Sequence, residues 1–249
     1  MATPNPRTIY QVKLTHIIDH TPEIRELILE PQSPDQFVFR AGQFAMLHVP
    51  AKPTPEQPNP TKPLLRAYSL ASAEQDHRSF RLIFKFVQNG AASDYVWSLK
   101  GQETLQFTGP FGKLFFPEPP TEQIVFLNTG SGISQHYCYI LSKSKTYPDL
   151  KMKLFFGVRT EKDIYFKKEL DQLKAENKNF DYDFVLSRPS SDWKGRKGYV
   201  QHQLETFDYK SVPTTFFLCG NSGMIKEAKA KLLEQDGIPS NRFLAEAFD

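Results

Sequence analysis

In the second half of the chain, short apolar runs alternate with segments that have the periodicity of amphipathic helices. Strands that alternate with helices form a parallel sheet through right-handed crossovers. We therefore predict an α/β domain with a five-stranded parallel sheet, and its ligands should bind beyond the carboxyl ends of the strands. The expected strands are 124–128, 153–158, 182–186, 215–218 and 243–248, and the expected helices are 133–143, 166–176, 200–205 and 224–235.

The first half of the chain shows short strands separated by turns. Aromatic, β-branched and alternating apolar residues predict strands at 10–18, 24–30, 43–49, 67–71 and 80–87. The segment from Pro50 to Pro63 contains six prolines, and it is predicted to be a surface loop because proline lacks a backbone donor. Several short strands of this kind predict a sandwich or a barrel. The run Pro117-Glu-Pro-Pro120 separates the half with short strands from the half in which strands alternate with helices. We therefore predict a first domain at 1–118 and a second domain at 119–249.

Composition excludes several classes of function. The chain has 249 residues, enough for two domains, and its net charge of +3 is too small to indicate nucleic-acid binding. No stretch approaches the roughly 18 apolar residues of a membrane helix. The first residues lack the pattern of a signal peptide, so we expect a cytoplasmic protein. Two cysteines cannot ligate an iron–sulfur cluster, and the six histidines form no metal-binding pattern, so no metal is expected.

Two glycine-containing turns follow expected strands of the second half. Asn128-Thr-Gly-Ser-Gly-Ile133 leads into a helix, where glycines let backbone amides approach a pyrophosphate. Cys219-Gly-Asn-Ser-Gly-Met224 also precedes a helix. Such turns can be purely structural, and a lone buried cysteine is usually an inert small side chain. Their position at the carboxyl edge of the sheet favours a functional role, but periodicity alone does not decide between these alternatives.

The first half contains a strand that combines several chemical groups. Arg66-Ala-Tyr-Ser69 carries a guanidinium, a phenol ring and a hydroxyl, and alternation places Arg66 and Tyr68 on the face opposite Ser69. Such a set suits clamping a phosphate, packing against a ring system and donating a hydrogen bond to a reacting edge. The alternative is an ordinary half-exposed strand. Gly90, Ser93 and the run Gly109-Pro-Phe-Gly112 indicate only turns when taken alone.

Taken in order, these motifs resemble those of the ferredoxin–NADP reductase superfamily. They are Arg66-x-Tyr68-Ser69, Gly90-x-x-Ser93, Gly109-Pro110-Phe111-Gly112, Thr129-Gly-Ser-Gly132, Cys219-Gly220 and Glu246-x-Phe248. Each motif is weak alone, but six in the right order across both predicted domains form a strong combined signal. The second half, with Trp193-x-Gly195-x-x-Gly198-Tyr199, also resembles the flavin module of sodium-pumping quinone reductases and bacterial oxygenase reductase modules without an iron–sulfur domain.

The resemblance implies an antiparallel Greek-key β-barrel that binds FAD, followed by an NAD(P)H-binding α/β domain. It implies a flavoprotein oxidoreductase in which nicotinamide and flavin carry out the hydride transfer, while the protein supplies alignment and electrostatics. Three residues would act at the reacting atoms. Ser69 would hydrogen-bond near the flavin nitrogen that accepts hydride, and Cys219 and Glu246 would flank the nicotinamide.

The resemblance also assigns cofactor contacts. Arg66 would pair with the FAD pyrophosphate, Tyr68 would pack on the isoalloxazine, and Phe248 would cover the flavin ring. The residues expected to bind FAD are Arg66, Ala67, Tyr68, Ser69, Lys85, Val87, Gly90, Ser93 and Phe248. The residues expected to bind NAD(P)H are Thr129, Gly130, Ser131, Gly132, Ser187, Arg188, Lys197, Tyr199, Gly220 and Met224.

Two features of the chain depart from the family. Members commonly continue Gly-x-Gly-x-Ala-Pro after the first strand of the nucleotide domain, whereas this chain has Ser134-Gln135. Loss of the proline is expected to relax the first helical turn and to affect the nicotinamide pocket. The long proline-rich loop before Arg66 is also unusual, and it is expected to reshape the approach to the adenine end of FAD.

Coenzyme choice is predicted from the end of the third strand of the nucleotide domain. Ser187-Arg188 is followed by Lys197-Gly-Tyr199, which is similar to the Ser-Arg and Lys-x-Tyr set that receives the adenosine 2′-phosphate in plant-type ferredoxin–NADP reductases. A hydroxyl, two cations and a stacking ring suit a dianionic phosphate. We therefore predict that NADPH is preferred over NADH. The alternative is a basic surface turn.

The electron acceptor is expected to be external, because the chain has no cluster of its own. A ferredoxin or a flavodoxin is the first hypothesis for this acceptor. The alternatives are an oxygenase component, a quinone and a free flavin. The chain could also be an electron-transfer subunit of a larger complex. We expect a monomer. A small excess of basic residues at 62–113 suits an acidic partner, and it is equally what a solvated surface would show: Lys62, Arg66, Arg78, Arg81, Lys85, Lys100 and Lys113.

Overall fold

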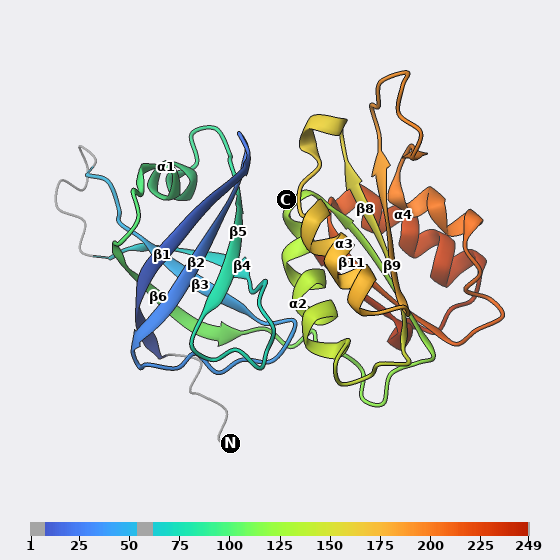
Figure 1. The fold of residues 1–249 in the computed structure, drawn as a ribbon, viewed down its shortest axis with the longest axis horizontal. Helices are drawn as coiled ribbons and strands as arrows, with labels where there is room; N and C mark the ends of the chain where they lie inside the picture. The colour runs from blue at the N-terminus through green and yellow to red at the C-terminus, as the bar shows by residue number, and fades with distance from the viewer. Residues whose placement is uncertain (1–7, 54–61, 249) are drawn as a thin grey trace. The chain divides into compact units, whose positions relative to one another are not determined.

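The computed structural model describes residues 8–53 and 62–248 (Figure 1). Contacts between Cα atoms divide the chain into two compact units, Met1–Phe115 and Phe116–Asp249. Phe116 belongs to the second unit because its ring stacks on Phe217, with ring centroids 5.6 Å apart. This division lies close to residue 118, where the sequence places the boundary. Residues 54–61 of the expected proline-rich loop lie outside the described residues.

The first unit is an antiparallel barrel, as predicted. Its strands form one sheet in the order β4-β3-β6-β1-β2-β5. A bridge between Leu70 and Leu82 joins the two ends of this order, so the sheet closes on itself. The strands are β1 (Ile9–Thr21), β2 (Ile24–Ser33), β3 (Phe44–Val49), β4 (Leu64–Ser69), β5 (Phe80–Lys85) and β6 (Thr104–Phe111), with helix α1 (Ala91–Ser98) after β5.

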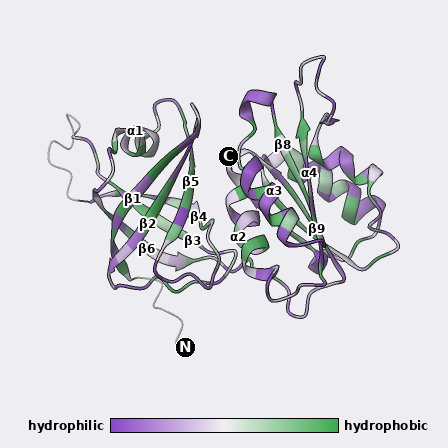
Figure 2. Cartoon of the chain, in the orientation of Figure 1, coloured by the Kyte–Doolittle hydropathy of each residue, from purple (hydrophilic) through white to green (hydrophobic). Residues whose placement is uncertain are grey.

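The barrel core follows from alternation along the strands. In β1, Tyr10, Val12 and Leu14 are buried while their neighbours are more exposed, and Figure 2 shows hydrophobic and hydrophilic residues alternating along β1 and β2. Phe37 fills the centre, with its ring stacked 4.7 Å from that of Phe80. The sequence did not predict β6 or α1. The Gly-Pro-Phe-Gly motif at the end of β6 resembles a turn, and α1 is too short to show a clear helical period.

The second unit is an α/β domain with a parallel sheet, as predicted. The sheet has six strands rather than five, in the order β10-β9-β8-β7-β11-β12. The additional strand, β10 (Arg196–Lys197), has only two residues and lies at the sheet edge, too short to show a period. The others are β7 (Gln123–Thr129), β8 (Lys151–Val158), β9 (Phe180–Leu186), β11 (Thr214–Gly220) and β12 (Phe243–Ala247).

Helices cover both faces of this sheet. Val125, Leu127 and Leu218 point to the face covered by α4 (Ser222–Lys229) and the 3₁₀ segment η3 (Val200–Thr206). The intervening Phe126 and Phe217 point to the other face, where both rings pack against Tyr139 of α2 (Ile133–Lys143). Helix α3 (Lys167–Glu176) packs beside β9. Burial on two faces explains why β7 and β11 are almost continuously apolar.

The helix boundaries largely follow the sequence pattern. Helix α2 spans the predicted residues, whereas the predicted helix at 200–205 is a 3₁₀ segment. Helix α4 begins after Asn221, whose side chain accepts a hydrogen bond from the Met224 amide at 3.1 Å, and continues as a π-helical turn, η4 (Ala230–Gln235). Among the described residues, no helix is both long and apolar enough to cross a membrane.

Candidate cofactor-binding and active site

The barrel unit places the Arg66-x-Tyr68-Ser69 motif on β4. Arg66 and Ala67 are exposed, whereas Tyr68 is half-buried with its ring centroid 4.3 Å from that of Phe84 on β5. Burial raises the pKa of Tyr68 to about 12, and the charge of Arg66 opposes this shift only in part. Tyr68 is therefore a neutral phenol at physiological pH, with one ring face fixed against the barrel. Ser69 is buried at the end of the strand, opposite Phe44 of β3.

The turn between β5 and α1 brings Ser93 to the backbone of Val87. The Val87 amide donates to the Ser93 Oγ at 2.8 Å, and the Gly90 amide donates to the Val87 carbonyl at 3.0 Å. A Cβ atom at Gly90 would lie only 3.0 Å from that carbonyl, so the turn needs glycine here. Ser93 holds the turn through its lone pair and keeps its hydroxyl proton for another acceptor. Lys85 and Val87 are exposed beside it.

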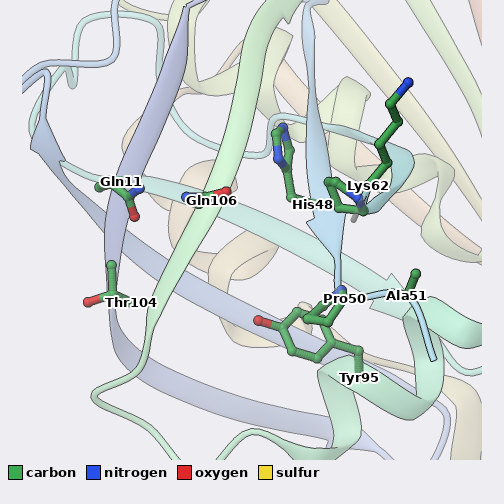
Figure 3. Close-up of a pocket in the computed structure, with 9 residues that line it drawn as sticks. Gln11, His48, Pro50, Ala51, Lys62, Tyr95, Thr104 and Gln106 are labelled. Atoms are coloured by element: carbon green, nitrogen blue, oxygen red, sulfur yellow. The ribbon is translucent and has the colours of Figure 1, made fainter. Parts of the chain in front are cut away.

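A cavity of about 500 Å³ opens on the outer side of the barrel (Figure 3). Polar side chains of β1, β3 and β6 line one part, and Tyr95 of α1 lines another. The His48 Nε2 lies 2.6 Å from the Thr108 Oγ1, and burial lowers the pKa of His48. The cavity lies where β3 enters the proline-rich segment and where Lys62 leads into β4.

In the α/β unit, the Thr129–Gly132 turn forms the carboxyl end of β7. Gly130 has φ +53°, and the space where its Cβ would lie is open. A Cβ at Gly132 would collide with the Cys219 carbonyl, and one at Gly220 would collide with the Thr129 side chain. Glycine is therefore required for β7 and β11 to end side by side. The first turn of α2 presents backbone amides that have no acceptor within the helix.

Three further contacts fix this turn. The Tyr165 hydroxyl donates to the Gly130 carbonyl at 2.9 Å, and the Ser134 hydroxyl donates to the Ser131 carbonyl at 2.7 Å. The Asn221 amide donates to the Thr129 Oγ1 at 2.9 Å, which links the two strand ends. The glycine cradle and the fixed helix N-terminus together suit a pyrophosphate.

Cys219 and Glu246 are brought together by the register of β11 and β12. Their Cα atoms are paired in the parallel ladder, although the residues are far apart in the sequence. Burial, with a smaller effect of the Glu246 charge, raises the pKa of the Cys219 thiol, so the thiol stays protonated. Burial also raises the pKa of Glu246, and a hydrogen bond from Gln135 opposes this shift. The Phe248 amide donates to the Gly220 carbonyl at 2.9 Å, which extends the ladder toward the chain end.

Sequence reasoning missed other polar residues near this edge. Asn128 and His136 are fully buried, and neither side chain has a hydrogen-bond partner among the described residues. Burial lowers the pKa of His136 to about 3, so the ring is neutral. A buried asparagine at the end of an otherwise apolar strand was the available signal for Asn128.

A second group of expected residues lies at the carboxyl ends of β9 and β10. Arg188, Lys197 and Tyr199 are exposed, and Ser187 is half-buried. The Gly198 amide donates to the Leu186 carbonyl at 2.9 Å, which brings the two segments together. Sequence reasoning missed Arg159, which follows β8 directly and accepts the Arg188 amide on its carbonyl at 2.8 Å. Its signal in the sequence was a cation directly after an apolar strand, whereas Arg188 was predicted from the resemblance to the family's phosphate-binding set.

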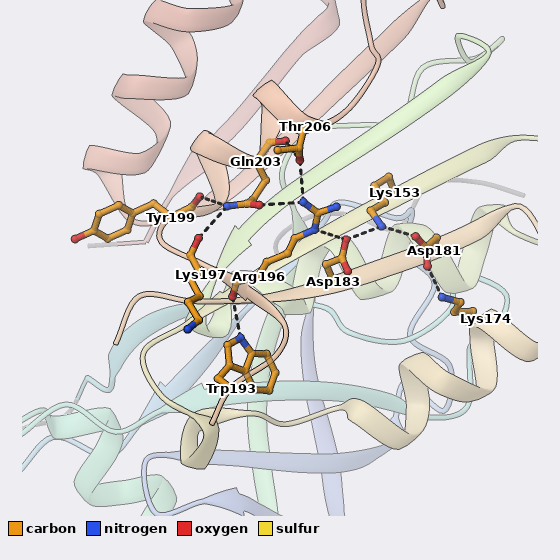
Figure 4. A network of polar contacts seen from close by, with 10 residues as sticks. All are labelled: Lys153, Lys174, Asp181, Asp183, Trp193, Arg196, Lys197, Tyr199, Gln203 and Thr206. Carbon is orange, nitrogen blue, oxygen red and sulfur yellow. Dashed lines mark hydrogen bonds and ion pairs between the residues drawn. The ribbon is translucent and has the colours of Figure 1, made fainter. Parts of the chain in front are cut away.

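A network of charged side chains holds β10 in place (Figure 4). Asp183 of β9 bonds both Lys153, at 2.8 Å, and the Arg196 Nε, at 2.7 Å. The same guanidinium donates to Gln203 and Thr206. Gln203 in turn donates to the carbonyls of Lys197 and Tyr199, which lie 3.2 and 3.3 Å away. The backbone that carries these two exposed side chains is therefore anchored to the sheet.

The geometry agrees with comparisons to known proteins. Residues 11–116 match the family of oxidoreductase FAD-binding domains, and residues 126–230 match the family of oxidoreductase NAD-binding domains. Ferredoxin–NADP reductase B of Sorangium cellulosum is 28% identical over 248 residues, which cover 96% of this chain and 98% of that protein. One subunit of the Na⁺-translocating NADH-quinone reductase of Yersinia pestis is 28% identical over 204 residues, 76% of this chain. The chain spans about half, 50%, of that quinone-reductase polypeptide.

Solved structures share the fold over almost the whole chain. The Amycolatopsis cytochrome P450 reductase GcoB superposes with a TM-score of 0.86 at 21% identity, covering 99% of this chain and 72% of that one. A Neisseria gonorrhoeae ferredoxin NADP⁺ reductase with bound FAD and NADP gives 0.79 at 21% identity, covering 98% and 99%. The chain belongs to the superfamily of ferredoxin–NADP reductase-like flavoproteins. It is an NAD(P)H-dependent oxidoreductase that uses FAD as its cofactor.

Proposed function

We propose that this protein oxidises NADPH and passes the electrons through FAD to a small external redox protein, a ferredoxin or a flavodoxin. NADPH would give up a hydride, which carries two electrons, and the reduced flavin would pass these on in single-electron steps, to two one-electron ferredoxins or to a flavodoxin. The observation that carries the coenzyme assignment is the exposed set of Arg188, Lys197 and Tyr199 at one edge of the parallel sheet. Two cations and a ring suit an adenosine 2′-phosphate.

On the barrel side, we assign the FAD contacts to β4 and the turn before α1. Arg66 pairs with the pyrophosphate, the free face of Tyr68 packs on the isoalloxazine, and Ser69 bonds its reacting edge. Ser93 donates its hydroxyl proton to a phosphate oxygen.

On the α/β side, we assign the NADPH pyrophosphate to Gly130, Ser131 and Gly132. The open space at Gly130 and the amides of the first α2 turn support this assignment. Cys219 and Glu246 lie beside the nicotinamide, with Thr129, Gly220 and Met224 forming the surrounding strand ends. When bound, the two cofactors supply the redox chemistry, and these residues align the nicotinamide and exclude water.

The first experiment is anaerobic reduction of the purified yellow protein followed by stopped flow. Rapid bleaching of the flavin, faster at low NADPH than at low NADH, is the expected result. Bleaching by neither coenzyme would overturn the assigned enzyme activity. A colourless protein that FAD cannot reconstitute would overturn the assigned barrel site.

Replacing Arg188 with alanine tests the coenzyme assignment. We expect NADPH binding to weaken by about tenfold, because a charge-assisted hydrogen bond contributes about 1.5–3 kcal/mol. NADH binding should change little. The matched control is Lys178→Ala, which removes an exposed cation just before β9, at the amino end of the strands. Equal losses for both coenzymes in R188A would contradict the assignment.

The acceptor needs a separate test. Flavin reoxidation by an acidic ferredoxin should slow steeply as salt rises if basic surface residues steer the encounter. A salt-independent rate would count against such docking.

The similarity to the sodium-translocating quinone reductase favours one alternative, an electron-transfer subunit of a quinone reductase or an oxygenase. A further alternative is an NAD(P)H:flavin reductase, which would reduce added free flavin faster than any protein acceptor. We also propose that the protein is a monomer, which light scattering would check.

A further inference from the structure

Gln135 forms an unusual contact at the start of α2. It is the third residue of the helix and is 1% exposed. Its Nε2 donates to the Glu246 Oε2 at 2.6 Å, which links the helix to β12 across 111 positions of sequence. In the family motif a proline commonly stands at this position, and proline has no side-chain donor. The contact is therefore a property of this chain.

Glu246 reaches Gln135 because of the sheet register. Leu127, Leu218 and Ala245 belong to the core cluster on the α4 face of the sheet. The next residues along β7, β11 and β12 are Asn128, Cys219 and Glu246, and they are Cα partners in the ladder. Alternation places these three on the α2 face. The Glu246 carboxyl thus lies between the Cys219 strand and the buried amide of Gln135.

The partner of Glu246 is neutral, which distinguishes this carboxyl from others in the chain. Glu246 takes part in no ion pair formed by the described residues, and Gln135 is the one side chain there that donates to it. A primary amide can serve both protonation states of a carboxyl group. It donates through Nε2–H to a carboxylate and, after a half-turn of the amide, accepts through Oε1 from a carboxylic acid.

The other end of the amide is available for this exchange. The Gln135 Oε1 is buried and has no hydrogen-bond partner within the residues that the structure describes. Among the described residues, the Glu246 carboxyl is therefore the one group that fixes the orientation of the Gln135 amide. A glutamine whose role was only to connect α2 to the sheet would stabilise the fold more if both its Nε2 and its Oε1 formed hydrogen bonds.

We propose that Gln135 is a positioning residue for Glu246, which holds the carboxyl beside Cys219 and follows its protonation by rotating its amide. This inference rests on the proposed role of Glu246 beside the nicotinamide. Gln135 itself does not contact the reacting atoms. It fixes the carboxyl in one place whether the group is ionised or protonated, so that the nicotinamide meets the same geometry in both states.

The test compares Gln135→Met with a matched control, Gln201→Met. Gln201 is also buried, its Nε2 donates to the Glu227 Oε2 at 2.7 Å, and its Oε1 also lacks a partner among the described residues. Methionine has a similar volume and removes the amide in both variants. Q201M therefore reports the cost of losing such a bond elsewhere in the same unit.

The first readout does not depend on turnover. The protein is labelled with ¹³C at the glutamate side-chain carboxyl, and the Glu246 signal is assigned by its loss in Glu246→Gln. The pKa of Glu246 should move upward in Q135M, because the hydrogen bond from Gln135 lowers it. It should not move in Q201M. An unchanged titration of Glu246 in Q135M would overturn the inference.

The second readout is flavin reduction by NADPH as a function of pH. The rate at neutral pH should fall roughly tenfold in Q135M, the loss of one hydrogen bond to a charged group. The pH at which the rate changes should move upward, and Q201M should match the wild type. In an E246Q background, Q135M should cause no further loss, and a full additional loss would also overturn the inference. Failure of the wild type to bleach at all would instead reject the proposed function, while the titration would still test Gln135.

Discussion

The two units each contain a glutamate whose carboxyl group is shielded from water, fully in the case of Glu26 and partly in the case of Glu246, and the two carboxyl groups have opposite surroundings. Glu26 of β2 is fully buried in the barrel, and it bonds Arg81 as well as the His20 Nε2, which lies 2.7 Å away. Burial raises the pKa of Glu26, but the hydrogen bonds and charges of its two partners outweigh this effect and lower it overall. Glu246 has a neutral amide instead, and its pKa stays raised.

The difference separates a carboxyl group that stabilises the fold from one that is suited to chemistry. The barrel compensates the Glu26 charge with two basic groups, so this carboxylate stays ionised and fixed. In the α/β unit, the neutral amide of Gln135 compensates the charge of Glu246 only in part. Both the ionised and the protonated form of this carboxyl group are therefore accessible. Burial raises the pKa of both carboxyl groups, so the opposite net shifts come from the charge of their hydrogen-bond partners.

The largest expected effect comes from Glu26→Gln. We expect the barrel unit to lose about 3 kcal/mol of unfolding free energy, because a buried ion pair loses its negative member. Urea unfolding followed by Trp97 fluorescence, in a Trp193→Phe background, measures the barrel separately. The control is Asp19→Asn, which breaks the exposed pair with Arg25 at 2.7 Å and should cost less than about 1 kcal/mol. Equal losses in both variants would remove the contrast between them.

The next largest effect is expected for Glu246→Gln, which should change the rate of flavin reduction rather than the free energy of unfolding. Flavin reduction by NADPH should slow by about 100-fold, the loss expected when a reacting group is misplaced by about 1 Å. The unfolding free energy of the α/β unit should stay equal to the wild type or rise, because a half-buried, partly compensated charge is removed. A variant that unfolds more easily but reacts at the normal rate would assign Glu246 to structure.

The smallest effect is a pair of opposite pH dependences. Because the folded-state pKa of Glu26 is lowered from 4.5, its stabilisation is complete above that pH and is lost as pH falls through the folded value. The stability difference between wild type and E26Q should therefore shrink in acid. The pKa of Glu246 is raised, so its ionised form costs stability at neutral pH, and acid relieves this cost. Urea midpoints measured between pH 7 and about 3 test both signs, because the change due to Glu26 falls below its unfolded pKa, and parallel slopes would contradict the comparison.

Sequence predicted most of the architecture because most of it is periodic. The α/β alternation, the barrel strands and the full extent of α2 follow from apolar spacing. Strand β6, helix α1 and the two-residue β10 could not be predicted, because their formation depends on partners elsewhere in the chain. The same limit applies to the site. Motifs identified Cys219 and Glu246, but only the strand register places Asn128 beside Cys219, and only the packing of α2 on the sheet brings Gln135 to Glu246.

The charged network around β10 has a consequence for how coenzyme preference can change. Asp183 and Arg196 anchor the backbone of Lys197 and Tyr199 from the sheet side, while Arg188 and the side chains of Lys197 and Tyr199 project outward. Substitutions at the exposed positions leave that anchor intact. A lineage, or an engineer, can therefore exchange these side chains one at a time and alter which dinucleotide is favoured without passing through an unstable intermediate sequence.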